Sequence, residues 1–107
     1  MESIKQKHKK WRISFRDAVF TRDKHKCTYC NITDNLDAHH ITDRHEMPNG
    51  GYVLSNGITL CTEHHKQAEL FHISEGLDWF ENMHPDDLYL KIKSNKDLAI
   101  SDSLKLR

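Results

Sequence analysis

The sequence of 107 residues predicts one small α+β domain. Three observations support this fold class. Apolar residues recur at helical spacing from Trp11 onward, two short extended segments flank a glycine-containing loop between residues 36 and 60, and a helical pattern begins near Thr62. A chain of this length buries only about two thirds of its unfolded surface, so we expect something besides an apolar core to stabilise it.

The first part of the chain combines a charged segment with an amphipathic one. Residues 1–10 are charged and lack an apolar period, so we expect a mobile, basic N-terminal arm, with a helical end as an alternative for its last residues. From Trp11 the apolar residues Phe15 and Val19 follow at helical intervals, while charged residues occupy other faces. This pattern predicts a helix over residues 11–22 that packs on the domain.

Two strands and a helix are expected in the middle of the chain. In order, they are a strand at 36–42, a loop at 43–52, a second strand or extended segment at 53–60 and a helix from 62 to 74. Alternation in the first strand would point His39 and His40 to opposite faces. Thr62 is suited to capping the helix and Gly76 to ending it.

Residues 77–107 carry no recognisable motif, and we expect them to form a helical extension. Short helices are predicted over 77–83 and 86–93, with a break at His84-Pro85. The last ten residues are expected to fray.

Charge and cysteine content narrow the class of protein. The chain is neutral overall, with 16 basic and 16 acidic residues, but residues 1–26 carry an excess of lysine and arginine. Such a segment could neutralise phosphates, or it could be a solvated tail. The start of the chain has no apolar stretch typical of a signal peptide or membrane span, so we expect a cytoplasmic protein that does not contact a membrane. The three cysteines are an odd number and fit reduced, metal-binding thiols better than disulfides.

The cysteines and one histidine have the spacing of a zinc site. Cys27 and Cys30 form one pair with two intervening residues, and Cys61 and His64 form another. Zinc takes four tetrahedral nitrogen or sulfur ligands, which these pairs supply. The zinc would clamp the base of the strand-loop-strand segment between the pairs. Buried cysteines without a metal are the alternative.

A second set of residues offers nitrogen and oxygen atoms, which are harder metal ligands than the cysteine thiolates of the first set. His65 and Glu69 are four residues apart and share one face of the predicted helix, whereas His64 points about 100° away. A strand histidine facing that helix could complete a site for Mg²⁺ or a transition ion. The adjacent strand histidine, if not a ligand, would have a pKa suited to general-base catalysis near neutrality. For His39-His40 alone, a surface pair is the alternative.

Several of these motifs together resemble the HNH endonuclease family, the ββα-metal nucleases, in its zinc-bearing branch. The resemblance covers about residues 11–72. The segment from Trp11-Arg12 to Arg22-Asp23 is also similar to the segment that precedes the motif in many small phage and bacterial HNH proteins. It is carried by Cys27-x-x-Cys30, Asp37-Ala-His39-His40-Ile41, Asn56-Gly-Ile-Thr-Leu60-Cys61 and His64-His65. It implies a small ββα-metal core with a structural zinc, an N-terminal helix and short C-terminal helices. The nuclease domain would span residues 11–76.

The resemblance also implies roles for the metal-binding residues. His39 and His65 would ligate a catalytic divalent metal, Mg²⁺, Mn²⁺ or Ni²⁺. Glu69 stands where related colicin DNases carry another histidine ligand and departs from that pattern. The metal would stabilise charge on the leaving 3′ oxygen, so that the products carry 5′-phosphate and 3′-hydroxyl ends.

Three further residues receive catalytic or supporting roles from the resemblance. His40 would deprotonate the water that attacks the scissile phosphate. Asn56 would tie the loop by side-chain hydrogen bonds and so hold His40 in place. Asp37 would orient a metal ligand or a metal-bound water, with an exposed strand carboxylate as the alternative.

The expected substrate is double-stranded DNA, cut on one or both strands with weak sequence preference. A homodimer, or a phage or host protein, is an expected partner. The alternative is a non-catalytic zinc-binding module on the same fold that contacts DNA or protein. Arg44 and His45 could contact phosphate, but we interpret them as ordinary surface residues. We interpret the remaining histidines as surface or packing residues: His8, His25, His72 and His84.

Overall fold

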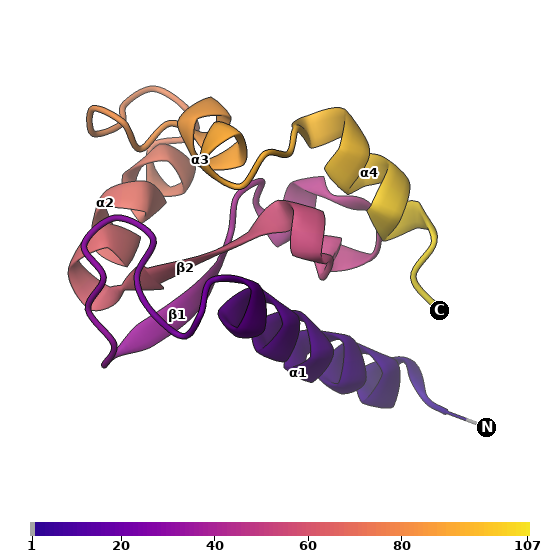
Figure 1. Ribbon diagram of the computed structural model, residues 1–107. Helices are drawn as coiled ribbons and strands as arrows, with labels where there is room; N and C mark the ends of the chain where they lie inside the picture. Colours follow the sequence, from indigo (N-terminus) through magenta and orange to yellow (C-terminus); the bar gives the residue numbers. More distant parts are fainter. Residues whose placement is uncertain (1) are drawn as a thin grey trace.

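The computed structural model describes residues 2–107 and confirms a small α+β fold (Figure 1). The helices and strands, in chain order, are α1 (Ile4–Arg22), β1 (Leu36–His40), β2 (Gly57–Cys61), α2 (Thr62–Ile73), α3 (Pro85–Lys91) and α4 (Lys96–Leu104). Three short 3-10 turns lie between the strands. Across residues 2–107, no helix combines the length and apolar character that crossing a bilayer requires.

The two strands form an antiparallel hairpin that runs directly into α2. Leu36 pairs with Cys61 at one end of the ladder, and His40 pairs with Gly57 at the other. Successive side chains of β1 point to opposite faces. His39 therefore faces α2, where it approaches Glu69, while His40 faces α1 and stacks on Phe15. The prediction that the two histidines point to opposite faces is confirmed.

Helix α1 packs closely on the hairpin because Gly57 has no side chain. A Cβ atom at Gly57 would lie 2.5 Å from Cγ2 of Val19 and 2.6 Å from Cε1 of Phe15. Phe15, Val19 and Tyr52 form the small apolar cluster at this contact. A larger cluster, built around Ile41, Ile58, Leu60, Leu88 and Ala99, joins the hairpin to α2, α3 and α4.

The expectation of a mobile arm over residues 1–10 is wrong for most of that segment. Helix α1 begins at Ile4, and Met1 lies outside the described residues. Ser3 and Gln6 form a capping box: the Ser3 hydroxyl accepts from the Gln6 amide at 3.1 Å, and Oε1 of Gln6 accepts from the Ser3 amide at 2.8 Å. The cap satisfies free amides of the first turn, so the helix forms without an apolar face there.

The strands are shorter than predicted, and the helix that follows starts differently. Residues Leu54–Asn56 form a 3-10 turn, which delays β2 until Gly57. Thr62 is the first residue of α2 rather than its cap, and Cys61 holds the cap position without a side-chain hydrogen bond. The Thr62 hydroxyl instead donates to the carbonyl of Asn35 at 3.3 Å.

The C-terminal part departs further from expectation. Residues 77–83 are not helical, and the expected frayed end contains α4. Asn95 caps α4, its Oδ1 accepting from the Leu98 amide at 2.8 Å. The helix is then held to the loop between the strands, because Asn49 donates to the Ser103 carbonyl at 3.0 Å.

Candidate functional site

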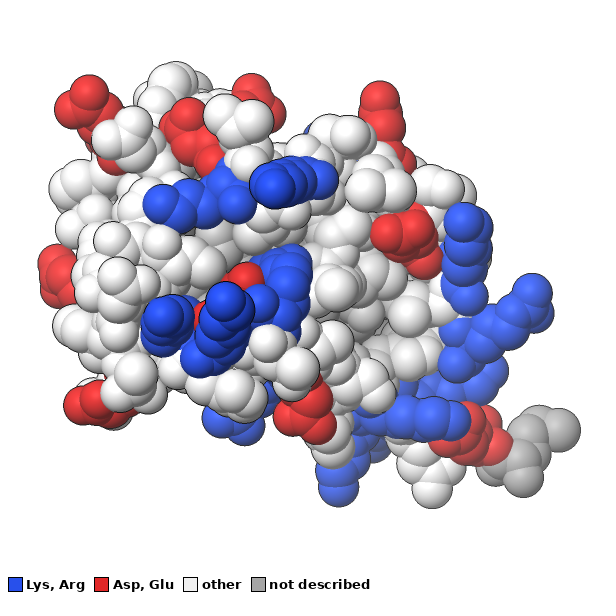
Figure 2. All heavy atoms as spheres, in the orientation of Figure 1, with Lys and Arg blue, Asp and Glu red and all other residues white. Residues whose placement is uncertain are grey.

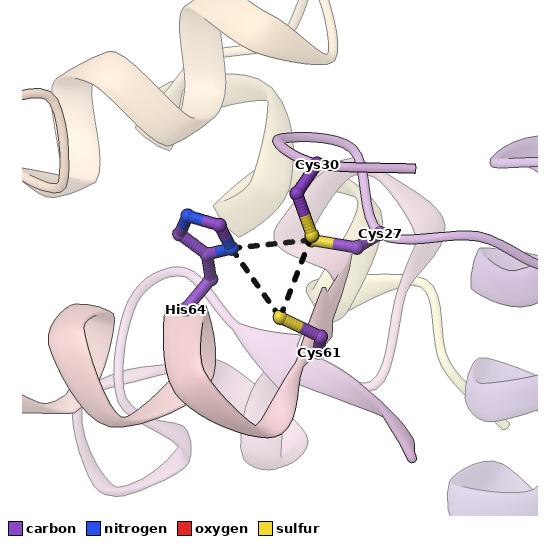
Figure 3. A group of neighbouring side chains, drawn as sticks. All are labelled: Cys27, Cys30, Cys61 and His64. Atoms are coloured by element: carbon purple, nitrogen blue, oxygen red, sulfur yellow. Dashed lines mark hydrogen bonds between the residues drawn. The ribbon is translucent and has the colours of Figure 1, made fainter. Parts of the chain in front are cut away.

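Cys27, Cys30, Cys61 and His64 converge on one point from three parts of the fold (Figure 3). The Sγ atoms of Cys30 and Cys61 are 3.7 Å apart, and Nδ1 of His64 lies 3.3 Å from Sγ of Cys61 and 3.6 Å from Sγ of Cys27. A tetrahedral zinc with Zn–S bonds of about 2.3 Å and a Zn–N bond of about 2.0 Å has ligand atoms about 3.4–3.8 Å apart, close to these separations. These four side chains could therefore hold a zinc ion.

The turn that carries the first two cysteines is shaped by backbone hydrogen bonds. The Cys27 amide donates to the Ile32 carbonyl at 2.8 Å, and the Asn31 amide donates to the Cys27 carbonyl at 2.9 Å. Burial alone would raise the pKa of the Cys27 thiol, but hydrogen bonds from the backbone of Cys61, Tyr29 and Cys30 lower this pKa to about 7. The lower pKa favours the thiolate, which is the form that binds zinc.

A second group lies beside the first and joins β1 to α2. Nδ1 of His39 and Nε2 of His65 each lie 3.2 Å from the same oxygen, Oε1 of Glu69. Separations of this size match a divalent cation with bonds of about 2.1 Å to each ligand atom. The structure thus brings together His39, His65 and Glu69, the three residues predicted to ligate a catalytic metal.

The imidazole of His39 is buried with ring nitrogens that are unpaired in the described part of the chain, as expected for a side chain that binds a metal ion. The ring is 1% exposed, and neither of its nitrogens has a hydrogen-bond partner within residues 2–107, although Nδ1 is close to Glu69. Burial lowers the pKa of His39, more than the Glu69 carboxylate raises it. Unsatisfied buried polar atoms are rare in folded proteins, and a cation at this point would satisfy Nδ1.

Asp37 lies behind His65 rather than in the ligand group. Its Oδ2 is 3.3 Å from Nδ1 of His65, while the other ring nitrogen of His65 approaches Glu69. Glu69 chiefly, with a smaller contribution from Asp37, raises the pKa of His65. A carboxylate on the far nitrogen fixes the orientation of a ligating imidazole.

His40 lies on the other face of β1, between two aromatic rings. It stacks on Phe15 at a centroid distance of 4.5 Å and meets the edge of Tyr52 at 5.0 Å. Burial lowers the pKa of His40 to about 4, so the expected pKa near neutrality is not found. The imidazole is neutral at physiological pH, which is the form that can accept a proton.

Asn56 is the centre of a fully buried hydrogen-bond network. Its Oδ1 accepts from the Thr42 amide at 3.0 Å and from the Tyr89 hydroxyl at 2.7 Å. Its Nδ2 donates to the carbonyls of Thr42 at 3.1 Å and Gly51 at 3.2 Å. The side chain therefore ties together both ends of the loop that follows His40.

His72, which we interpreted as a surface or packing residue, contacts the second group. Its Nε2 lies 3.1 Å from the backbone oxygen of His40, and its ring stacks on that of His39 at 5.3 Å. His72 follows Glu69 by three residues and His65 by seven, so all three share one face of α2. That spacing is a sequence signal that could have identified it.

Both histidines of β1 open onto one cavity of about 420 Å³. The second group and His72 contribute to its lining, together with apolar residues, the carboxylates Asp37 and Asp43, and three arginines: Arg12, Arg16 and Arg44. Arg44 is exposed but lines the cavity, which favours the phosphate-contact alternative over an ordinary surface residue. His45 is exposed and lies outside this lining. His84 instead caps α3 by accepting from the Asp86 amide.

The structure has an antiparallel hairpin that is followed directly by a helix. Histidines from the strand and the helix meet at one point, which is the arrangement of the ββα-metal class of domain. The family model of the HNH endonuclease matches residues 27–70, which include most of the motifs that carried the resemblance in the sequence. The chain matches no curated protein and no solved structure closely enough to establish a relationship.

Proposed function

We propose that this protein is a metal-dependent HNH endonuclease that hydrolyses phosphodiester bonds of DNA and leaves 5′-phosphate and 3′-hydroxyl ends. One observation carries the proposal. The His39, His65 and Glu69 group and the neutral His40 share a single cavity whose remaining wall contains arginines. A cation site, a proton acceptor and anion-binding groups within one cavity suit hydrolysis of a phosphodiester.

The ligand set proposed for the catalytic metal is His39, His65 and Glu69, and the metal would be Mg²⁺, Mn²⁺ or Ni²⁺. A metal bound there would act as a Lewis acid on the phosphoryl group and stabilise charge on the leaving oxygen. Asp37 would keep His65 in its ligating orientation through the 3.3 Å contact with Nδ1.

His40 is the proposed general base. Its Nε2 is buried and has no hydrogen-bond partner among residues 2–107, and His40 lines the cavity in which the attacking water would be bound. The rings of Phe15 and Tyr52 fix the plane of the imidazole, and Asn56 holds the loop that begins directly after it. Arg12, Arg16 and Arg44 would bind the phosphates on either side of the scissile bond.

Zinc in the Cys27, Cys30, Cys61 and His64 group would have a structural role. These residues join the loop after α1 to the end of β2 and the first turn of α2. A bound zinc would fix the base of the hairpin from which His39 and His40 project.

The test is cleavage of supercoiled plasmid DNA with Mg²⁺, Mn²⁺ or Ni²⁺ added, comparing the natural protein with His40→Ala. His45→Ala is the matched control, because His45 is exposed and lies outside the cavity. We expect His40→Ala to lose at least about a hundredfold in rate and His45→Ala to retain full activity. Equal rates for the natural protein and His40→Ala would reject the enzymatic role and leave a non-catalytic DNA- or protein-binding module.

A further inference from the structure

Helix α1 presents a row of cations that continues beyond the cavity. Lys5, Lys9, Arg12 and Arg16 are spaced by four, three and four residues. At 100° per residue their side chains fall within an arc of about 60° on the helix surface. We call these four residues the basic face of α1.

The basic face is free to bind an anion. All four side chains are exposed, and none forms an ion pair within residues 2–107. Lys10, on another side of the helix, differs because its Nζ lies 3.5 Å from Glu2. Asp17 is the single acidic residue of α1, and it also lies away from the basic face.

One end of the basic face is part of the candidate active site. Arg12 and Arg16 line the same cavity as His40 and Glu69. Arg16 is further positioned by Phe20, with its Cζ 5.2 Å from the ring centroid. Lys5 and Lys9 extend the same face toward the N-terminus. Figure 2 shows Lys and Arg side chains gathered at the lower right of the molecule, around the N-terminal half of α1.

The helix that carries the basic face is held firmly at both ends. The capping box of Ser3 and Gln6 closes the first turn, and Phe15 and Val19 are buried against the hairpin. In between, Nε1 of Trp11 donates to the backbone oxygen of Arg107 at 3.0 Å. The backbone that carries the four cations is therefore continuous with the part of α1 that packs beside the cavity.

We propose that the basic face of α1 is the docking surface for the phosphate backbone of duplex DNA, leading one strand into the cavity. The identification of the polymer as DNA rests on the proposed function. From Lys5 to Arg16 the face is about 16 Å long, at 1.5 Å per residue. This length corresponds to about five phosphates of one strand, at 3.4 Å per phosphate along the duplex axis.

A row of cations on a rigid helix matches the regular charge of a duplex and offers no group that reads a base edge. Binding at this face is therefore electrostatic, independent of sequence and sensitive to salt. Each phosphate contact contributes about 0.9 to the slope of log K against log salt concentration. Removing two cations from the face lowers that slope by about 1.8.

The experiment measures the binding of a fluorescein-labelled 20-base-pair duplex by anisotropy between 50 and 200 mM NaCl, without added divalent metal. Lys5→Gln/Lys9→Gln removes half of the basic face and leaves the cavity intact. Lys7→Gln/Lys24→Gln is the control, because it removes two lysines that lie off the basic face, outside the cavity, and that form no ion pair within residues 2–107. Glutamine preserves helix propensity, and circular dichroism confirms that both variants fold.

We expect the basic-face variant to bind more weakly and with a slope smaller by about 1.8, while the control binds like the natural protein. An equal loss in both variants, or no loss in either, overturns the proposal. Plasmid cleavage by the same proteins separates it from the proposed function. Cleavage that is independent of Lys5 and Lys9 refutes the docking surface alone, whereas binding that requires Lys5 and Lys9 without any cleavage refutes the nuclease activity alone.

Discussion

Oδ2 of Asp37 in β1 lies 3.3 Å from Nδ1 of His65 in α2. The contact places a carboxylate behind an imidazole whose other nitrogen faces Glu69 at 3.2 Å. Asp37 and His65 belong to different elements, β1 and α2, so the pair links the strand to the helix at the candidate metal site.

The first prediction follows from this contact. Asp37→Asn should weaken Mn²⁺ binding about 10- to 100-fold, because losing a carboxylate behind a ligating histidine commonly has this effect. Isothermal titration calorimetry with Mn²⁺ on zinc-loaded protein measures it. Asp34→Asn is the control, since Asp34 is exposed and contacts only Thr33 in its hydrogen bonding. Unchanged Mn²⁺ affinity in Asp37→Asn would reject the positioning role.

The second prediction separates the adjacent residues His64 and His65. His64→Ala should lower Tm by more than about 10 °C and reduce the zinc content, because a loss of about 2 kcal/mol or more in a domain of this size shifts Tm by that amount. His65→Ala should keep both its zinc and its Tm, while losing affinity for Mn²⁺. Mass spectrometry of the native protein and thermal denaturation provide the measurements. Equal destabilisation by both substitutions would contradict the division into two sites.

The third prediction concerns the network around Asn56. Asn56→Ala should lower the free energy of unfolding by about 2–4 kcal/mol, because it leaves several buried groups of Thr42 and Gly51 without partners. Tyr89→Phe should lose about 1–2 kcal/mol, since it removes one hydroxyl that is shared by Asn56 and Thr42.

Combining the two substitutions tests the network itself. Urea denaturation of Asn56→Ala, Tyr89→Phe and the double variant forms a double-mutant cycle. We expect the double variant to lose less than the sum of the single losses, because both substitutions break the same bond. Additive losses would mean that the Asn56 and Tyr89 side chains are energetically independent.

The fourth prediction concerns the contact of α1 with the hairpin. Gly57→Ala should lower the free energy of unfolding by about 1–3 kcal/mol, because its Cβ would meet Val19 at 2.5 Å and Phe15 at 2.6 Å. Urea denaturation measures the loss. Val19→Ala removes the atom nearest to the added Cβ. Val19→Ala should therefore lower the free energy of unfolding less in the Gly57→Ala background than in the natural protein. Equal costs in both backgrounds would show that Gly57 is not limited by this contact.

The sequence predicted the parts of the site that depend on local spacing. The pairs Cys27 with Cys30 and Cys61 with His64 are each joined by one turn of backbone, and His65 and Glu69 lie one helical turn apart. Such spacings determine relative positions without knowledge of the rest of the fold. The strand histidines then followed from the two-residue period of β1.

Features set by distant contacts were not predictable in the same way. The low pKa of His40 arises from burial, to which Phe15 and Tyr52 contribute from α1 and the loop. Likewise, α4 is held by a hydrogen bond between Asn49 and Ser103, 54 positions apart. The early start of α1 is a different case, because the Ser3 and Gln6 capping pair is visible in the sequence and was outweighed there by the lack of apolar residues.

His64 and His65 are consecutive residues of α2, yet their side chains belong to different candidate metal groups. Both histidines are attached to one helix. A rotation of α2 about its axis would therefore move both side chains together. Inserting a single residue between them would turn His65 by about 100° relative to His64, so that only one of the two ions could be held at a time. If both groups bind ions, the position of the two histidines along one helix would couple the two sites, without any side chain shared between them.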